Sequence, residues 1–74
     1  MSEKSLEEIV FLVEEAPEGG YTAKALGASI VTEADNLEGL RRQVVDAVHC
    51  HFADHPRPPR LIRLHLVKDE VLTA

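Results

Sequence analysis

The sequence predicts an α+β domain in which one helix packs on a four-stranded sheet, with the elements in the order β-β-β-α-β. Three observations lead to this fold class. The 74 residues suffice for a single domain, 1–74, and leave no room for a second. One stretch alone repeats its apolar residues with the period of a helix. The other apolar runs are short and bounded by turn residues, as strands are.

Residues 35–52 are expected to form the only substantial helix. Asp35 or Asn36 can cap its first turn, and Glu38 would complete a capping box with Asp35. Pro56 disfavours helical geometry at the residue before it, so the helix should end near residue 53 or 54. The apolar residues of the stretch recur every three or four positions and so share one face: Leu37, Leu40, Val44, Val48 and Phe52, widened by Val45 and Ala47.

The first strand is expected at residues 9–13, where the run Ile-Val-Phe-Leu-Val is apolar without alternation. A short strand of this kind is buried on both faces and lies in the middle of a sheet. The turn Ala-Pro-Glu-Gly-Gly at 16–20 returns the chain into a hairpin partner at 21–25. A third strand is expected at 29–33.

A stiff, proline-rich connector at 54–59 follows the predicted helix and leads into the clearest alternating strand, at 60–67. Val71-Leu72-Thr73 can add a last short strand. Because three antiparallel strands and a crossover helix come before the strand at 60–67, it should lie parallel to the first strand. The predicted sheet order is therefore 3-2-1-4.

One helix covers one face of such a sheet, so the other face is expected to be open. That face should carry Val10 or Leu12 together with Lys24, Arg63 and His65. A half-apolar, uncovered face is the expected place for a second subunit or another protein. We therefore take Lys24, Arg63 and His65 as candidate partner-binding residues, although the polar outer face of a half-buried strand is the simpler explanation of Arg63 and His65.

Charge and cysteine content restrict the function classes. The formal net charge of −5 argues against broad, phosphate-driven binding of nucleic acid. The charge is uneven, since residues 1–38 hold nine acids and two bases, whereas residues 39–74 hold six bases and four acids. With one cysteine there is no internal disulfide to staple a small core, which makes self-association as a homodimer the expected substitute.

The opening residues lack the pattern of a signal peptide, and no apolar run has the length of a membrane span, so a cytoplasmic protein is expected. Residues 1–6 are expected to be flexible.

Neither catalysis nor metal binding has good support. A metal-dependent nuclease needs clustered carboxylates, whereas Glu14 and Glu15, as neighbours in a strand, point to opposite faces. We expect no enzyme activity and no cofactor. His51 and His55 are four residues apart, as helical metal ligands are, but Pro56 frays the helix at His55, so they are weak candidates and no metal site is expected. Cys50 is expected to line the flank of the helix as a small apolar group.

Residues 7 to about 52 combine four features in order: the Ile9–Val13 strand, the Glu-Gly-Gly-Tyr-Thr-Ala run at 18–23, the strand ending in Thr32-Glu33, and the Asp-Asn-Leu-Glu helix start at 35–38. This ordered pattern resembles the HicB-like antitoxin family. It implies a partial ribonuclease-H-like fold and a role in binding a small mRNA-cleaving toxin, HicA, whose catalytic site the antitoxin covers. Members of the family add a DNA-binding segment for which this chain has no residues left, so it looks like a compact stand-alone branch.

We therefore expect a non-catalytic, HicB antitoxin-like interaction domain that acts as a homodimer and occludes a protein partner, a HicA-like toxin being the candidate. The alternative is a stand-alone ligand- or RNA-binding module that uses the basic C-terminal half.

Overall fold

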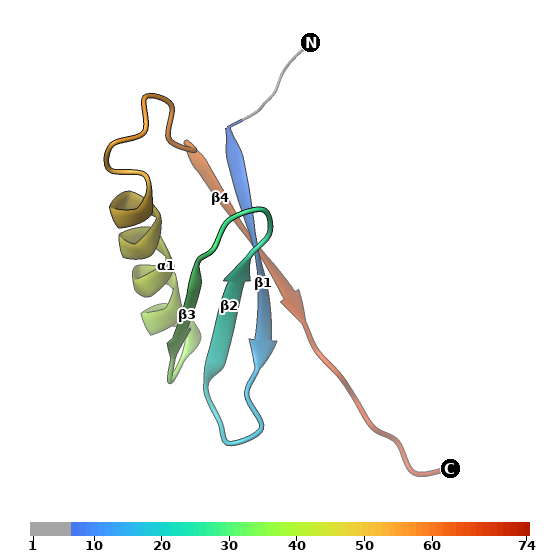
Figure 1. Cartoon of the computed structure of the whole chain (residues 1–74). Helices are drawn as coiled ribbons and strands as arrows, with labels where there is room; N and C mark the ends of the chain where they lie inside the picture. Colours follow the sequence, from blue (N-terminus) through green and yellow to red (C-terminus); the bar gives the residue numbers. More distant parts are fainter. Residues whose placement is uncertain (1–6) are drawn as a thin grey trace.

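The computed structural model describes residues 7–74, and its elements follow the predicted order (Figure 1). They are β1 (Glu8–Glu15), β2 (Tyr21–Ala25), β3 (Val31–Ala34), α1 (Leu37–His51) and β4 (Leu61–Val67). Residues 1–6, expected from the sequence to be flexible, lie outside the described residues.

The four strands form one sheet of order β3-β2-β1-β4, as predicted. β1 pairs antiparallel with β2 and parallel with β4, and β2 pairs antiparallel with β3. β1 therefore lies in the interior of the sheet, as predicted. The prediction that it is buried on both faces is wrong, because Ile9, Phe11 and Val13 are buried whereas Val10 and Leu12, on the face that no element of the described chain covers, are half-buried. The start of β4 is held against β1, because the backbone N–H groups of Arg60 and Leu61 donate to the carbonyl of Glu7 at 2.8 and 3.1 Å.

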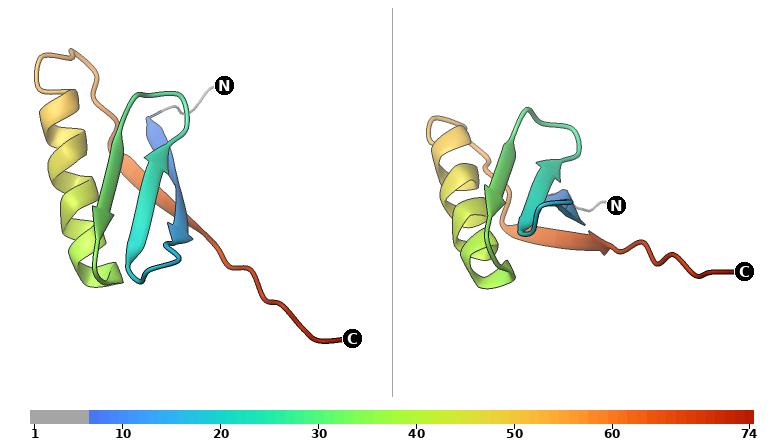
Figure 2. Two further views of the ribbon diagram at one scale, coloured as in Figure 1. Left: turned by 60° about the horizontal axis from the view of Figure 1, so that its bottom comes forward. Right: turned by 90° about the horizontal axis from the view of Figure 1, so that it is seen from below.

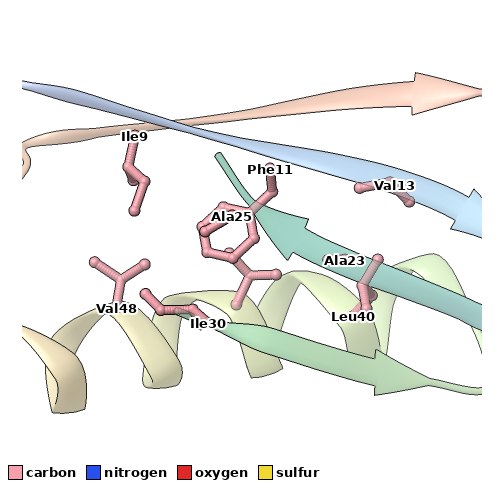
Figure 3. Close-up of a cluster of buried hydrophobic side chains, with 9 residues drawn as sticks. Ile9, Phe11, Val13, Ala23, Ala25, Ile30, Leu40 and Val48 are labelled. Carbon is pink, nitrogen blue, oxygen red and sulfur yellow. The ribbon is translucent and has the colours of Figure 1, made fainter. Parts of the chain in front are cut away.

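The hydrophobic core lies between α1 and one face of the sheet, shown in Figure 3. Phe11 on β1 and Leu40 on α1 are both fully buried in it. The buried residues that β2 contributes to this face are the alanines Ala23 and Ala25, and small side chains there allow the helix backbone to lie close to the strand. The buried set is Ile9, Phe11, Val13, Ala23, Ala25, Ile30, Leu40, Val44 and Val48.

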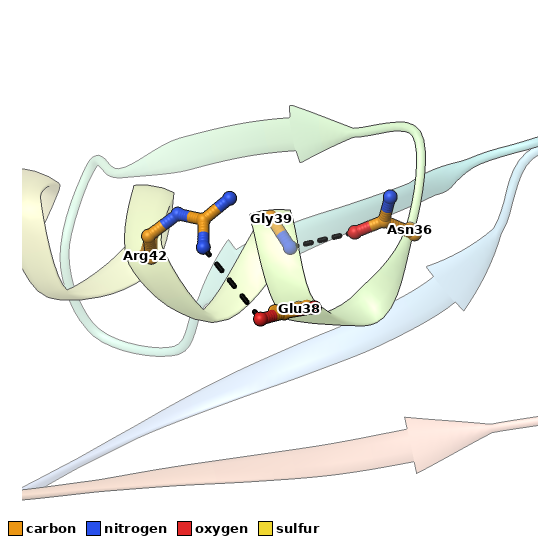
Figure 4. Close-up of polar contacts among 4 residues, drawn as sticks. All are labelled: Asn36, Glu38, Gly39 and Arg42. Carbon is orange, nitrogen blue, oxygen red and sulfur yellow. Dashed lines mark hydrogen bonds and ion pairs between the residues drawn. The ribbon is translucent and has the colours of Figure 1, made fainter.

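The helix is capped by Asn36, whose Oδ1 accepts a hydrogen bond from the backbone N–H of Gly39 at 2.7 Å (Figure 4). The capping box expected between Asp35 and Glu38 does not form. Asn36 is the N-cap, and Glu38 Oε2 instead lies 3.8 Å from Nη1 of Arg42, one helical turn further on.

The helix ends two residues earlier than predicted, at His51, with Phe52 as the C-cap. The following residues close tighter turns, since the N–H of His55 donates to the carbonyl of Phe52 at 3.0 Å. This tightening takes place directly before Pro56, which the helix could not have included.

The helix lies closest to β3 and β2, and its core side chains also cover the helix-facing residues of β1. The two views of Figure 2 show α1 beside β3 at one edge of the sheet, while β4 runs away from α1 toward the C-terminus. The sheet face turned toward the helix is therefore fully covered at β2 but only partly at β4, where Ile62 and Leu64 are half-buried and Leu66 is 53 % exposed. Val45, which was expected to widen the buried stripe, is 41 % exposed for the same reason.

The additional strand that Val71-Leu72-Thr73 can add does not form. Residues 68–74 have no regular structure and run away from the domain beyond the end of β4 (Figures 1 and 2). A strand requires a neighbour to satisfy its backbone groups, and the described chain places none beside this segment.

Candidate partner-binding face

The face of the sheet opposite α1 brings together the three residues that the sequence singled out. In the strand register, Lys24 on β2 and His65 on β4 both stand opposite Leu12 on β1, so the three form one row across the sheet. Arg63 stands opposite Val10 two residues away along the same face. The face is thus a short apolar centre, Val10 and Leu12, flanked on both sides by basic or ionisable side chains. We call these five residues the open face.

The exposure of the five side chains differs between the centre and the flanks of the open face. Val10 and Leu12 are half-buried, whereas Lys24, Arg63 and His65 are exposed. No helix of the described chain covers the open face, since α1 packs on the opposite side. The long side chains next to Val10 and Leu12 screen part of their surface, as aliphatic stems of basic residues do.

Acidic side chains border the open face and moderate its charge. The guanidinium of Arg63 donates through Nε to Glu8 Oε2, within the same face. Glu14 and Glu33 flank Thr22 in the next row of the register. The face therefore has mixed charge around an apolar centre, which suits a protein surface better than a polyphosphate chain.

Glu14 and Glu15 lie on opposite faces of the sheet, as the sequence predicts. Glu14 aligns with Thr22 and Val67 on the open face, while Glu15 aligns with Tyr21 on the face toward the helix. Two carboxylates on opposite sides of a sheet cannot share a metal ion.

The two weak metal candidates lie on either side of one aromatic ring. The ring of Phe52 is 4.8 Å from that of His51 and 5.6 Å from that of His55, both in edge-on geometry. His55 Nδ1 also accepts a hydrogen bond from the N–H of Arg57 at 3.0 Å. Among residues 7–74 no group of three potential ligands gathers around them. Cys50, expected to line the helix flank as an apolar group, is instead exposed.

The bases of the C-terminal half do not form one surface. Arg41 and Arg42 lie on the helix, Arg60 ends the connector and Arg63 lies on the open face. Three of the six are within ion-pair distance of glutamates, Arg42 with Glu38, Arg60 with Glu7 and Arg63 with Glu8. These three ion pairs bring bases of the C-terminal half beside acids of the N-terminal half, so the uneven charge along the sequence is partly balanced in space.

One surface was missed by the sequence reasoning. Because α1 sits over β2 and β3, a shallow groove of about 290 Å³ opens between the helix and β4. Its lining is mainly apolar: Arg41, Val44, Val45, Ile62 and Leu64. In the sequence, Ile62, Leu64 and Leu66 alternate with polar residues, which indicates that one side of the strand is apolar but not that this side stays partly uncovered.

In the described part of the chain, α1 is too short and too polar to cross a membrane.

Comparison with known proteins identifies close relatives. The chain is 51 % identical over 55 residues to a UPF0150 protein of Archaeoglobus fulgidus, a match that covers 74 % of this chain and 82 % of the relative. It is 40 % identical over 67 residues to a UPF0150 protein of Thermotoga maritima, covering 90 % and 93 %. No family model matches the sequence, and no solved structure matches it. At this identity and coverage, the chain belongs to the UPF0150 family.

Proposed function

We propose that this protein is a non-catalytic interaction domain, HicB antitoxin-like, that assembles as a homodimer and uses its open face to bind and occlude a protein partner. The candidate partner is a small, basic, mRNA-cleaving toxin of the HicA type. The observation that carries the proposal is the row Lys24–Leu12–His65, in which an apolar side chain lies between two hydrophilic ones on a face that α1 leaves bare. Occlusion requires only such a complementary surface and no chemistry from this chain.

The residues that resemble the HicB family support the likeness of fold. Gly19 and Gly20 both have positive φ, at 103° and 85°, and they make the hairpin turn that precedes Tyr21. A Cβ on Gly20 would come within 2.8 Å of the carbonyl oxygen of Ala34. Asn36 caps the helix. These residues have structural tasks, so the case for partner binding depends on the open face and not on the motif.

A toxin of this type has to be neutralised by a stable, stoichiometric complex. Val10 and Leu12 supply apolar area, and Lys24 and His65 can pair with acidic groups near the partner's catalytic site. The carboxylates bordering the face, Glu8, Glu14 and Glu33, can pair with bases of a basic partner.

The test is capture of the partner from the native cell with the tagged full chain, followed by an RNA-cleavage assay. We expect a small protein that cleaves RNA alone and is inhibited at equimolar antitoxin. Leu12→Glu should weaken the complex at least ~30-fold, because it places a carboxylate in the apolar centre, about 2 kcal/mol. Arg42→Glu, on the exposed side of α1, is the matched control and should bind normally. Full binding by Leu12→Glu, or a captured protein that does not cleave RNA, would refute the proposal.

The alternative, an RNA- or ligand-binding module using the basic half, has weaker support because Arg42, Arg60 and Arg63 are already beside glutamates. It predicts RNA binding that weakens steeply between about 50 and 200 mM salt. Filter binding to single-stranded RNA across that range separates the two hypotheses.

A further inference from the structure

The edge of the sheet formed by β4 is unusually open. β4 is seven residues long and has a strand on one side only, whereas β3 at the opposite edge has four residues and lies beneath α1. A long edge strand presents a row of unpaired backbone groups, and natural proteins shorten, cover or charge such edges. Here the edge is long and two of its residues, Leu61 and Leu66, are more than half exposed.

The segment that follows β4 carries two exposed apolar residues. Residues 68–74 run on beyond the strand, with Val71 at 93 % and Leu72 at 79 % exposure. Asp69 and Glu70 precede them. We call residues 68–74 the C-terminal tail. Two adjacent, almost fully exposed apolar residues at the end of an open edge strand are typical of a surface that is covered on assembly.

The groove beside β4 provides the third element. It runs between α1 and the helix-facing side of β4, with Val45 and Leu64 in its lining and Arg41 beside them. Within residues 7–74, Arg41 makes no ion pair. The groove therefore offers an apolar floor and a cationic group next to it.

The β4 edge, the C-terminal tail and the groove are complementary to the same surfaces of a second copy of the chain. We propose that two copies pair antiparallel along β4 and the C-terminal tail, joining the two sheets into one continuous sheet of eight strands. In an antiparallel pair, residues directly opposite each other share a face. With Leu66 opposite its own counterpart on the two-fold axis, the partner subunit's Asp69 stands opposite Arg63, and the partner subunit's Val71 stands opposite Leu61.

This register satisfies both faces of the new sheet. On the open-face side, the two Arg63–Asp69 pairs are opposite charges at the cross-strand distance. The exposed Leu61 gains the equally exposed Val71 as its neighbour. On the helix-facing side, the partner subunit's Glu70 stands opposite Ile62, next to the groove that Arg41 lines. The tail that has no partner in the single chain thus becomes a strand, which is what its sequence pattern favours.

The inference rests on the homodimer of the proposed function and names its interface. The two can fail separately, since assembly is measured by mass and partner binding by capture. Loss of toxin binding by a dimeric chain would contradict partner binding alone, and a wild type that is dimeric together with a Val71→Asp/Leu72→Asp variant that stays dimeric would contradict the interface alone.

The experiment is light scattering coupled to size-exclusion chromatography on the full chain, with sedimentation equilibrium for the dissociation constant. We expect twice the 8.2 kDa chain mass. The double variant Val71→Asp/Leu72→Asp should raise the dissociation constant at least ~30-fold, although both positions lie outside every element of the fold. Val31→Asp, an exposed valine on the β3 edge, is the matched control and should stay dimeric.

Charge reversal tests the register. Arg63→Asp and Asp69→Arg should each be monomeric alone, because each homodimer would bring two pairs of like charges together. An equimolar mixture of the two variants restores both opposite-charge pairs and should recover the dimer. Circular dichroism checks that each variant is folded. Arg63→Asp also removes the Arg63–Glu8 ion pair, whereas Asp69→Arg keeps it, so a monomer in both variants is not explained by the loss of that ion pair. A monomeric wild type at 100 µM, a dimeric Val71→Asp/Leu72→Asp variant, or a mixture that stays monomeric would overturn the proposal.

Discussion

The side-chain oxygen of Asn36 accepts a hydrogen bond from the backbone N–H of Gly39 at 2.7 Å, while the neighbouring Asp35 has no such contact. The extended backbone of Asn36, with φ −144° and ψ 169°, is the conformation of an N-cap residue. One of the four free N–H groups at the start of α1 is satisfied in this way.

Asn36→Ala should therefore lower the free energy of unfolding by about 1 kcal/mol, the usual loss when a capping side chain is removed. Asp35→Ala is the matched control, and its effect should stay within about 0.5 kcal/mol. Urea denaturation followed by circular dichroism measures both. Equal losses from the two variants would show that the cap is shared.

The two glycines of the β1–β2 hairpin should differ in their tolerance of alanine. Both have positive φ, so alanine strains either position by about 1–2 kcal/mol. At Gly20 the added Cβ would also lie 2.8 Å from the Ala34 carbonyl oxygen, whereas at Gly19 it would meet nothing within 4 Å. Gly20→Ala should thus lower the stability of the protein more than Gly19→Ala does. Thermal unfolding of the two variants measures the difference. A larger loss at Gly19 would contradict the close approach of the hairpin to the end of β3.

Substitutions at two neighbouring residues of β1, Phe11 and Leu12, should differ in their effect on the free energy of unfolding. Phe11 is fully buried beneath α1, so Phe11→Ala should cost about 3–5 kcal/mol, a large part of the stability of a chain this short. Leu12 is half-buried on the open face, and Leu12→Ala should cost less than half as much. Denaturant midpoints compare the two variants. Similar losses would mean that the open face is already covered in the isolated protein.

The hydroxyl of Thr32 is buried and has no hydrogen-bond partner among the described residues. Replacing it with a methyl group in Thr32→Val removes the cost of an unsatisfied polar atom and suits a strand, so we expect a gain of about 1 kcal/mol. Thr22→Val, on the other face of the sheet, is the control and should change stability little. A loss of stability in Thr32→Val would indicate that the hydroxyl has a partner after all.

Much of the candidate site could be predicted from the sequence because it depends only on strand parity. Once residues 9–13 are placed in the middle of the sheet, Leu12 has to lie opposite residues of both neighbouring strands. Lys24 and His65 then follow from the hairpin and the crossover. The groove beside β4 could not be found in this way, since a periodic pattern indicates which side of a strand is apolar and not whether another element covers it.

The sequence by itself therefore determined the order of the elements, the central place of β1 and the residues on each face, since these depend on local periodicity and on the rules of chain connection. Only the tertiary structure decided where α1 lies across the sheet, which of Asp35 and Asn36 caps it, and that residues 68–74 stay unpaired. The physical reason is that the helix settles where side-chain volumes on both surfaces match. Ala23 and Ala25 on β2 admit it more closely than the larger residues of β4, so the far edge of the sheet is left open.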